Sequence, residues 1–395
     1  MISTAFRYSV FLFLLVVLMG PVNAQYTGNT INVVTTAVPF LRISPDARSG
    51  GMGELAIATS ADASASYFNI GKVPFNESTG GINVTYTPWL KKLVNDVYLA
   101  SASGFYKFDE NQAISGSLRY FSLGSIQFTD NFGNQISTQN PREFGVDLGY
   151  SRKLSPTTGF GVGLKYIYSN LAGGASIGST TYKAGSAVAG DIGIFHSSLN
   201  DQGAGWNFGA AVSNLGSKIA YTDNADQKDF IPANLGIGTT YTSVLDESNK
   251  VTFGIDINKL LVPTPPVSTG DYTTDSTHLV DYRQKSVVSS WFSSFSDAQG
   301  GMSEELKEFQ VSVGAEYWYN NQFALRAGYF YEDKTKGNRR FFTTGVGIKY
   351  NVFGLNFSYL IPSGSGTNQN PLSNTLRFSL VFDLNGADGG TTTTQ

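Results

Sequence analysis

Long segments in which apolar and polar residues alternate recur along this chain from Ile82 to Asn385. In the last segment, apolar residues occupy every second position: Leu376, Phe378, Leu380, Phe382 and Leu384. Successive side chains of a strand point to opposite faces, so this segment has one apolar face and one face that carries Arg377 and Asp383. The segments run about ten to fourteen residues, whereas sandwich strands have about five or six, and about ten tilted residues span a bilayer. The pattern predicts the strands of a transmembrane β-barrel.

About fourteen such segments are present, and each begins near one of these residues: Ile82, Asn95, Gln112, Arg142, Gly159, Gly185, Ala204, Asn234, Asn249, Phe309, Gln322, Phe341, Gly354 and Asn374. Short connections, such as Asp109–Asn111 and the one at Phe353, alternate with longer ones. The longer set is Lys91–Val94 (an exceptionally short member), Gln127–Pro141, Leu171–Ala184, Ser217–Ala233, Leu261–Glu308, Asp333–Arg340 and Pro362–Ser373. In bacterial barrels short turns face the periplasm and long loops face outside. We therefore expect an all-β, antiparallel transmembrane barrel of about fourteen strands in the outer membrane, with both termini periplasmic.

The N-terminus has the features of a secretion signal. Arg7 precedes an apolar run from Val10 to Met19, and Val22–Ala24 supplies the small-residue pattern that signal peptidase cleaves. The run is shorter than the roughly 20 residues that a spanning helix needs. The predicted organisation is a signal peptide over 1–24, a hatch over 25–81, the barrel over 82–385 and a flexible tail over 386–395.

Composition excludes several other classes of protein. Charged residues make up 14%, the net charge is −3, and aromatics reach 13%, a balance that disfavours nucleic-acid binding. The chain has no cysteine and two histidines, which excludes disulfides and thiolate metal sites and disfavours a histidine metal site. We expect no cofactor and no bound metal.

A fourteen-stranded barrel encloses a lumen that must be filled, and the segment from Gln25 to Gly81 is the candidate filling. It lacks strong alternation and contains Asp-Ala-Arg, Gly-Met-Gly and Ser-Ala-Asp-Ala-Ser-Ala between Ser44 and Val73. These motifs resemble the N-terminal hatch of the FadL family of fourteen-stranded outer-membrane proteins. That family has Asn-Pro-Ala where this chain has Asn69, Ile70 and Gly71, and the stretch from Thr36 to Glu54 is more similar to the PorV and PorQ branch.

The resemblance covers nearly the whole mature chain and implies a function in type IX protein secretion. In that branch, the barrel binds the conserved C-terminal signal domain of cargo proteins at a giant translocon barrel of the SprA or Sov type. It then delivers the cargo to a cell-surface attachment complex of the PorU type. The implied partners are therefore these proteins, together with outer-membrane lipids.

Five hatch residues stand out: Asp46, Arg48, Gly51, Gly53 and Asn69. Asp46 and Arg48 are a candidate functional pair, but a salt bridge and helix cap that fix the hatch in the lumen explain them better. The glycines resemble a phosphate loop only superficially, because a phosphate loop continues with Lys-Ser or Lys-Thr and these glycines do not. We expect them to permit close packing of the hatch.

The connection Leu261–Glu308 is far longer than usual, which points to function or disorder. Trp291, Phe292 and Phe295 lie among serines and predict a short amphipathic helix or apolar flap. Exposed apolar side chains outside the membrane mark a partner site, but these aromatics fit equally well a lid on the barrel mouth or the outer-leaflet interface. Ser303–Lys307 predicts one capped helical turn.

Two other functions compete with secretion. His196 and Ser198 have the spacing of a strand-borne base and nucleophile, but they fall near the periplasmic rim and no carboxylate on that face orients the imidazole. We therefore predict no enzyme. Uptake of hydrophobic small molecules, as in FadL-type transporters, explains the hatch as well as secretion does, and it stays open as the alternative.

Overall fold

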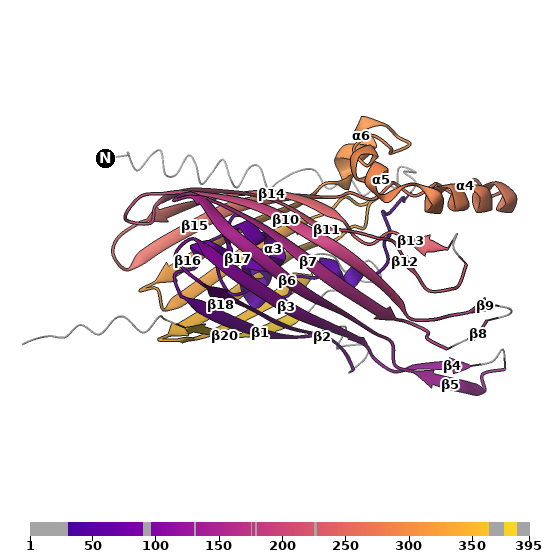
Figure 1. Cartoon of the computed structure of the whole chain (residues 1–395), viewed down its shortest axis with the longest axis horizontal. Coiled ribbons are helices and arrows are strands. Elements are labelled where there is room, and N and C mark those ends of the chain that lie inside the picture. The colour runs from indigo at the N-terminus through magenta and orange to yellow at the C-terminus, as the bar shows by residue number, and fades with distance from the viewer. Residues whose placement is uncertain are drawn as a thin grey trace, which may run out of the picture. The chain divides into compact units, whose positions relative to one another are not determined.

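The computed structural model describes residues 31–89, 96–129, 132–174, 176–177, 180–224, 227–362 and 375–384. Residues from Asn32 onward belong to one compact unit. Among the described strands, fourteen close into an antiparallel barrel in chain order (Figure 1). They are β1 (Gly80–Pro88), β2 (Val97–Lys107), β3 (Gln112–Leu123), β6 (Arg142–Ser155), β7 (Thr158–Asn170), β10 (Gly185–Leu199), β11 (Gly205–Gly216), β14 (Asn234–Val244), β15 (Asn249–Leu260), β16 (Gln310–Tyr319), β17 (Phe323–Tyr331), β18 (Arg340–Tyr350), β19 (Phe353–Pro362) and β20 (Leu376–Leu384). The predicted fold class is confirmed.

The first and last strands close the barrel, with Gly80 opposite Leu384 and Tyr86 opposite Phe378. Every predicted strand start lies within two residues of an observed one, because the alternation that we used is the alternation of wall and lumen. The connection predicted at Phe353 is displaced: Phe353 opens β19, and the turn is formed by Asn351, which has a positive φ of 51°, and Val352.

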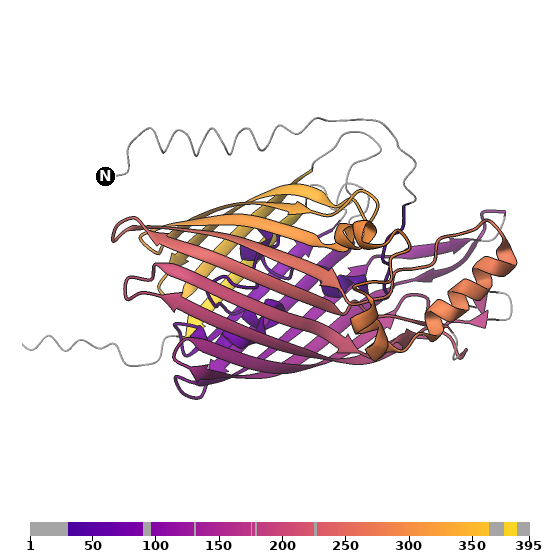
Figure 2. The same cartoon turned by 90° about the horizontal axis from the view of Figure 1, so that it is seen from above.

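The barrel has two unlike ends, which Figure 2 shows on its left and right. At the short-turn end the strands are joined by tight turns. At the loop end, three connections predicted as loops form two-stranded hairpins: β4–β5 (Ile126–Thr129 and Gln135–Gln139), β8–β9 (Ser176–Ile177 and Thr180–Thr181) and β12–β13 (Ile219–Ala220 and Lys228–Asp229). The longest connection carries α4 (Tyr272–Gln284), α5 (Val287–Ser293), α6 (Met302–Glu305) and η3 (Leu306–Glu308) at the same end.

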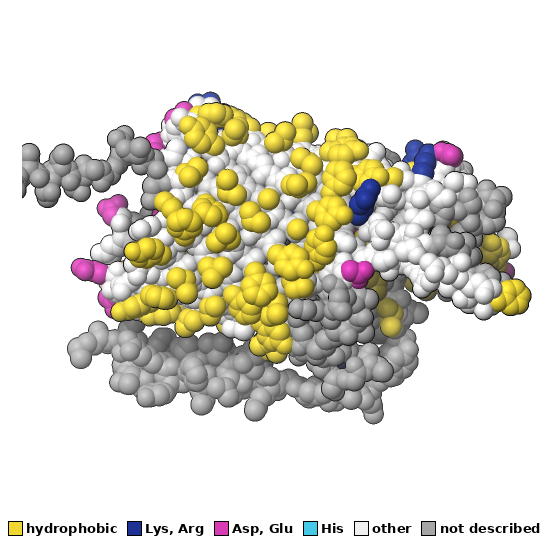
Figure 3. Space-filling model, turned by 90° about the horizontal axis from the view of Figure 1, so that it is seen from below, with side chains coloured by type: hydrophobic (Ala, Val, Ile, Leu, Met, Phe, Trp, Pro, Cys, Tyr) yellow, Lys and Arg dark blue, Asp and Glu magenta, His cyan; other side chains and the backbone are white. Residues whose placement is uncertain are grey.

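The outer wall is apolar. Along β7, Val162, Leu164 and Tyr166 face outward and are exposed, whereas the neighbouring Lys165 is buried toward the lumen. On the face of the wall seen in Figure 3, apolar side chains are widespread, and the Lys, Arg, Asp and Glu side chains in view lie toward the two ends of the barrel. A surface of this kind is stable against lipid chains and unfavourable in water. Among the described residues, no helix is long and apolar enough to cross a membrane.

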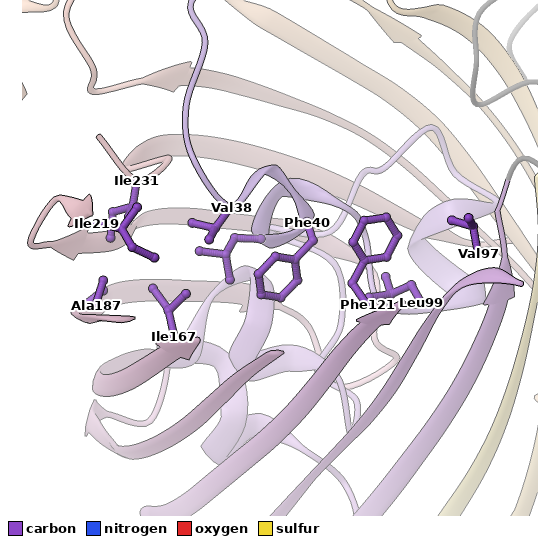
Figure 4. Packing of buried hydrophobic residues seen from close by; sticks show 11 residues of the cluster. Val38, Phe40, Val97, Leu99, Phe121, Ile167, Ala187, Ile219 and Ile231 are labelled. Atoms are coloured by element: carbon purple, nitrogen blue, oxygen red, sulfur yellow. The ribbon is translucent and has the colours of Figure 1, made fainter. Parts of the chain in front are cut away.

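The lumen contains the hatch, whose short elements are η1 (Pro39–Arg42), α2 (Ala47–Gly50), α3 (Ala65–Phe68) and η2 (Ile70–Phe75). Near the loop end, Val38 and Phe40 of the hatch pack against inward-facing apolar residues of the wall (Figure 4). The rings of Phe40 and Phe121 stack with centroids 6.4 Å apart. Here the lumen has an apolar core of its own, so the hatch is held by packing as well as by polar contacts.

The predicted signal peptide, the cleavage before Gln25, the connection Lys91–Val94 and the tail 386–395 lie outside the described residues, as does nearly all of Pro362–Ser373. Leu384 lies at the short-turn end, next to Gly80. Asn32 lies instead at the loop end, where its amide donates to the carbonyl oxygen of Thr335 at 3.0 Å. The described part of the hatch therefore runs from the loop end at Asn32 inward to β1. The location of the two chain ends stays a prediction.

Candidate functional site

The hatch helix α2 begins at Asp46, whose carboxylate accepts a hydrogen bond from the amide of Ser49 at 2.8 Å and so caps the helix. Arg48 takes other partners. Its guanidinium donates two hydrogen bonds to Glu316 of β16, at 2.9 and 2.7 Å, and one to Asp62 at 2.9 Å. The pair that the sequence suggested is thus divided, because Asp46 starts the helix while Arg48 fastens the hatch to the wall.

Glu316 is the centre of this attachment and is 3% exposed. Its carboxylate also accepts from Arg326 of β17 at 2.7 Å, and Arg326 reaches Asn356 of β19 at 2.9 Å. One buried carboxylate therefore neutralises two guanidinium groups, one from the hatch and one from the wall. Removal of one partner from such a cluster strongly destabilises the fold, because the remaining charges would be buried without compensation.

Two further polar contacts fix the hatch to the wall. Asp256 of β15 accepts hydrogen bonds from the amides of Ala56 and Ile57, at 2.7 and 2.9 Å. Arg377 of β20 donates to Glu54 at 2.8 Å. These bonds join the hatch backbone and side chains to two more strands, β15 and β20, so the hatch is held by several strands of the wall.

Glycines on the inner wall let the hatch come this close. A Cβ added at Gly328 would lie 2.1 Å from the carbonyl carbon of Met52, and one at Gly314 would lie 2.4 Å from the oxygen of the same residue. In the hatch, Gly53 has a φ of +70° and a Cβ there would lie 2.6 Å from the amide nitrogen of Tyr329. A Cβ on Gly51 would meet the backbone of Gly345 at 3.0 Å. Backbone thus packs on backbone, and these glycines leave no phosphate cradle between them.

Asn69 joins the hatch to β10. Its side-chain oxygen accepts from the amide of Gly71 at 3.0 Å, which caps η2. Its side-chain nitrogen donates to the carbonyl oxygens of Ile57 and Ile194, at 3.1 and 2.9 Å. The asparagine at this position therefore satisfies three backbone groups that burial would otherwise leave without partners.

Between the hatch and the loop end lies a cavity of about 690 Å³. Aromatic side chains line it, among them Phe40, Tyr67, Trp89, Phe121, Phe330 and Phe341. Arg42, Arg339 and Arg377 add positive charge to its walls, and Glu54 and Asp256 add negative charge. The size is that of a site for a small molecule, and the mixed lining fits an amphipathic one.

The helix α4 was not foreseen from the sequence. Its start has a signal in hindsight, because Asp271 accepts from the amide of Thr274 at 2.8 Å and caps the helix. Burial gives no periodic signal, since Tyr282 is the one side chain of α4 that is buried while Tyr272 is 86% exposed. The helix extends from the loop end away from the wall (Figures 1 and 2).

The aromatic triplet of the long connection lies on and beside α5, which confirms the predicted short helix. Trp291 is half-buried, Phe292 is 75% exposed and Phe295 is 39% exposed. Both views show α5 and α6 over the outside of the barrel rim, not across its mouth (Figures 1 and 2). Binding of a protein partner by these three residues stays a prediction.

A buried ionic cluster attaches this connection to the rim. Lys259 of β15 is 1% exposed and pairs with Glu305 at 3.1 Å and with Glu308 at 2.7 Å. Lys336, from the connection between β17 and β18, pairs with Glu304 at 2.6 Å and with Glu308 at 2.9 Å. We call these five residues the rim cluster. The sequence suggested a helical turn at Ser303–Lys307 but not this role for its glutamates.

The turn itself starts earlier than predicted. Gly301 is the N-cap of α6, so Ser303 lies inside the helix and does not cap it. Glu304 and Glu305 instead accept hydrogen bonds from the amides of Gly300 and Ala298, both at 2.7 Å. Partial burial raises the pKa of Glu304, but the hydrogen bonds from Lys336 and Gly300 outweigh it and leave that pKa below its usual value. In Lys336 the same contacts outweigh burial and raise the pKa.

The histidines lie apart from these sites. His196 and Ser198 face outward at the short-turn end of β10, and the Nδ1 atom of His196 lies 2.9 Å from the Oγ1 atom of Thr158. His278 lies on α4. Within the described ranges, no three His, Asp or Glu side chains are grouped so that they could hold a metal ion.

Comparison with known proteins gives the family. The model of the family described as type IX secretion system protein PorV matches residues 26–267. The chain belongs to this family. In structure, this PorV-family chain is similar to the toluene transporter TbuX of Ralstonia pickettii, with a TM-score of 0.51 and 11% identity over 86% of this chain and 97% of that one.

The monoaromatic hydrocarbon channel CymD is also similar, with a TM-score of 0.50 and 11% identity over 89% of this chain and 100% of that one. At such low identity these two structures show a shared fold. No curated protein matches the sequence. The PorV-family chain is thus an outer-membrane β-barrel of the type IX secretion system.

Proposed function

We propose that this protein is a secretion adaptor that binds the C-terminal signal domains of cargo at the translocon barrel and carries the cargo to the cell-surface attachment complex. The observation that carries the proposal is the filled lumen. Glu316, Asp256 and Arg377 hold the hatch from several strands, and the space above it is about 690 Å³. That is room for a small molecule and not for a folded domain. A barrel of this kind serves protein secretion through its surface.

The loop end is the surface best suited to partners. It carries three hairpins and the exposed helix α4, whereas the short-turn end carries tight turns. In bacterial barrels long loops face outside and short turns face the periplasm, which supports an orientation with the loop end outside and Leu384 on the periplasmic side. For the N-terminus, the position of Asn32 at the loop end argues against a periplasmic start of the hatch.

We also propose the organisation expected from the sequence: a cleaved signal peptide over 1–24, a hatch over 25–81, the barrel over 82–385 and a tail over 386–395. The absence of catalysis belongs to the same proposal. His196 and Ser198 lie on the outward face of β10, where Thr158 is the neighbour of the imidazole.

The adaptor function is testable by capture of a purified cargo signal domain. Replacement of residues 271–284 with a Gly-Ser linker removes α4 and leaves the rim cluster intact. We expect this variant to bind the signal domain at least about tenfold more weakly than the unmodified protein, a change of about 1.4 kcal/mol. A matched control replaces residues 246–248 at the short-turn end with Gly and Ser. Binding that is absent in the unmodified protein, or equal in all three, would contradict cargo recognition at the loop end.

A second function, transport of hydrophobic small molecules, is favoured by the aromatic lining of the cavity. TbuX is described as a toluene transporter and CymD as a monoaromatic hydrocarbon channel. Toluene should then quench the fluorescence of Trp89. It should also enter liposomes faster when the protein is present in their membrane. Variant Trp89→Phe serves as the control for the quenching. Uptake without binding of cargo would favour transport over the adaptor.

A further inference from the structure

The short helix α5 has an unusual distribution of side chains. Val287, Ser290 and Ser294 lie on the face that packs against the protein, and Ser290 and Ser294 are buried. The opposite face presents Val288, Phe292 and Phe295, which are exposed. A helix on a water-soluble surface buries its apolar face and exposes its polar one. On α5, Val288 and Phe292 are exposed while Ser290 is buried, and the helix carries no charged residue, so its outer face is suited to apolar surroundings.

The attachment of this helix fixes its height on the barrel. Phe253, Ile255 and Ile257 face outward from β15, and Lys259 continues the same face without a break in register. Its ammonium group is covered by Glu305 and Glu308, and the rings of Phe295 and Phe309 lie 5.8 and 5.4 Å from it. The connection therefore packs on the outside of the wall, directly beyond the last exposed apolar residues of β15.

The neighbouring elements repeat the pattern. Met302 of α6 and Leu306 of η3 are 67% and 63% exposed. From Leu306 the chain passes through Phe309 into β16, where Val313 faces outward and is exposed. Figures 1 and 2 show α5 and α6 outside the wall at the rim of β14, β15 and β16. The apolar side chains of the connection thus lie next to the apolar wall that an outer-membrane barrel presents to lipid.

We propose that α5, α6 and η3 form an interfacial platform that inserts its apolar side chains into the membrane leaflet at the loop end. The occupant of this surface is the upper acyl region of that leaflet. Continuity with the lipid-facing wall and the lack of charge on α5 favour lipid over a protein partner, whose rim contacts would be polar. The rim cluster serves the platform by neutralising Lys259, which would otherwise place a charge at the edge of the hydrocarbon.

The absence of cysteine in the chain allows a direct test. Single variants Phe292→Cys, Leu164→Cys and Tyr272→Cys are labelled with a nitroxide and reconstituted in liposomes. Leu164, on the wall, is the reference for lipid and Tyr272, on α4, is the reference for water. Collision rates with oxygen, which concentrates in lipid, and with a nickel complex, which stays in water, are measured for each label. Because all three side chains are exposed, the substitutions leave the fold intact.

We expect the ratio of oxygen to nickel collisions at residue 292 to be several times that at residue 272 and to approach that at residue 164. A ratio equal to that at residue 272 would overturn the platform and favour the prediction that Phe292 contacts a protein partner. Low collision rates with both reagents would also overturn it, because the side chain would then be covered by protein. The measurement uses no cargo, so its outcome is independent of the adaptor function.

Discussion

The hatch and the long connection between β15 and β16 are both anchored to strand β15, on opposite faces of the wall. Asp256 points into the lumen and accepts two hatch amides, whereas Lys259, three residues later, points outward and holds Glu305 and Glu308. The described part of the hatch is fixed by bonds to several strands and by close packing on glycines. The connection is fixed at its root by the rim cluster, and α4 beyond it is exposed. The inside of this barrel is closely packed, whereas the connection outside the loop end is attached through the rim cluster and leaves most of α4 exposed.

The largest effect should come from Glu316, because two buried guanidinium groups depend on its carboxylate. We expect Glu316→Gln to lower the free energy of unfolding by about 3–5 kcal/mol, the usual cost of breaking a buried ion pair. Thermal unfolding in detergent, followed by circular dichroism, measures the change. The control is Asp223→Asn, which breaks an exposed pair with Lys183 and should cost about 0–1 kcal/mol. Equal losses in both variants would show that the hatch is not anchored at Glu316.

The next effect tests the glycine contacts. Gly328→Ala forces a Cβ against the backbone of Met52, which should cost about 1–3 kcal/mol and displace the hatch. We expect brief openings in planar-bilayer recordings and faster hydrogen exchange in residues 50–57. In the control Gly190→Ala the nearest atom is 3.5 Å away, which is ordinary contact. A silent recording for Gly328→Ala together with unchanged exchange would argue against a tightly packed hatch.

A smaller and local effect is expected at the rim cluster. Lys259→Met keeps the length of the side chain but removes its ammonium group, so Glu305 loses its lysine partner and Glu308 retains Lys336. Loss of hydrogen bonds to a charged group costs about 1.5–3 kcal/mol, here as local opening. Hydrogen exchange should rise across residues 286–308 while the barrel strands and the hatch stay protected. If exchange rises in the hatch as well, the two anchors are coupled and the connection is not fixed independently of the hatch.

The smallest effect is that of pH on the same cluster. Glu304 has a pKa below its ordinary 4.5, so its contribution is present above pH 4.5 and is lost as the pH falls through the lowered value. Lys336 has a pKa above its ordinary 10.5, so its contribution is present below pH 10.5 and is lost as the pH rises through the raised value. Protection of residues 300–308, corrected for intrinsic exchange, should be level between these limits and fall outside them. A change in this protection near pH 7 would show that groups other than Glu304 and Lys336 hold the connection.

The sequence was a good guide to the barrel and a poor guide to what is attached to it. Wall strands obey a rule of period two that Leu376–Leu384 shows plainly, so all fourteen could be found one by one. The helix α4 has no apolar stripe that could predict it, because Tyr282 is the one side chain of the helix that is buried. The sequence predicts a loop where β4 and β5 form a hairpin, because this segment lies beyond the membrane, where no alternation of lipid and lumen marks a strand.

Long-range contacts were also out of reach. Arg48 and Glu316 are 268 residues apart in the chain, and no local pattern connects them. Proximity in the sequence suggests that Arg48 pairs with Asp46. In the structure Asp46 caps α2, whereas Arg48 binds Glu316 of the wall. Along β15 the outward positions are apolar up to Ile257, and the next outward position is the charged Lys259. This interruption of the apolar pattern is the one signal in the sequence that points to the rim cluster.

The closing pair of strands has a consequence for how the molecule is made. The amide of Ala47 in the hatch donates to the hydroxyl of Ser379 in β20, 332 residues later, and β20 also pairs with β1. The hatch is synthesised early, but its contacts are complete only when the last strand is present. Both the seam between β1 and β20 and the hatch contact at Ala47 depend on the last strand. A chain that ends before β20 would therefore lack both the pairing that closes the barrel and the contact of Ser379 with the hatch.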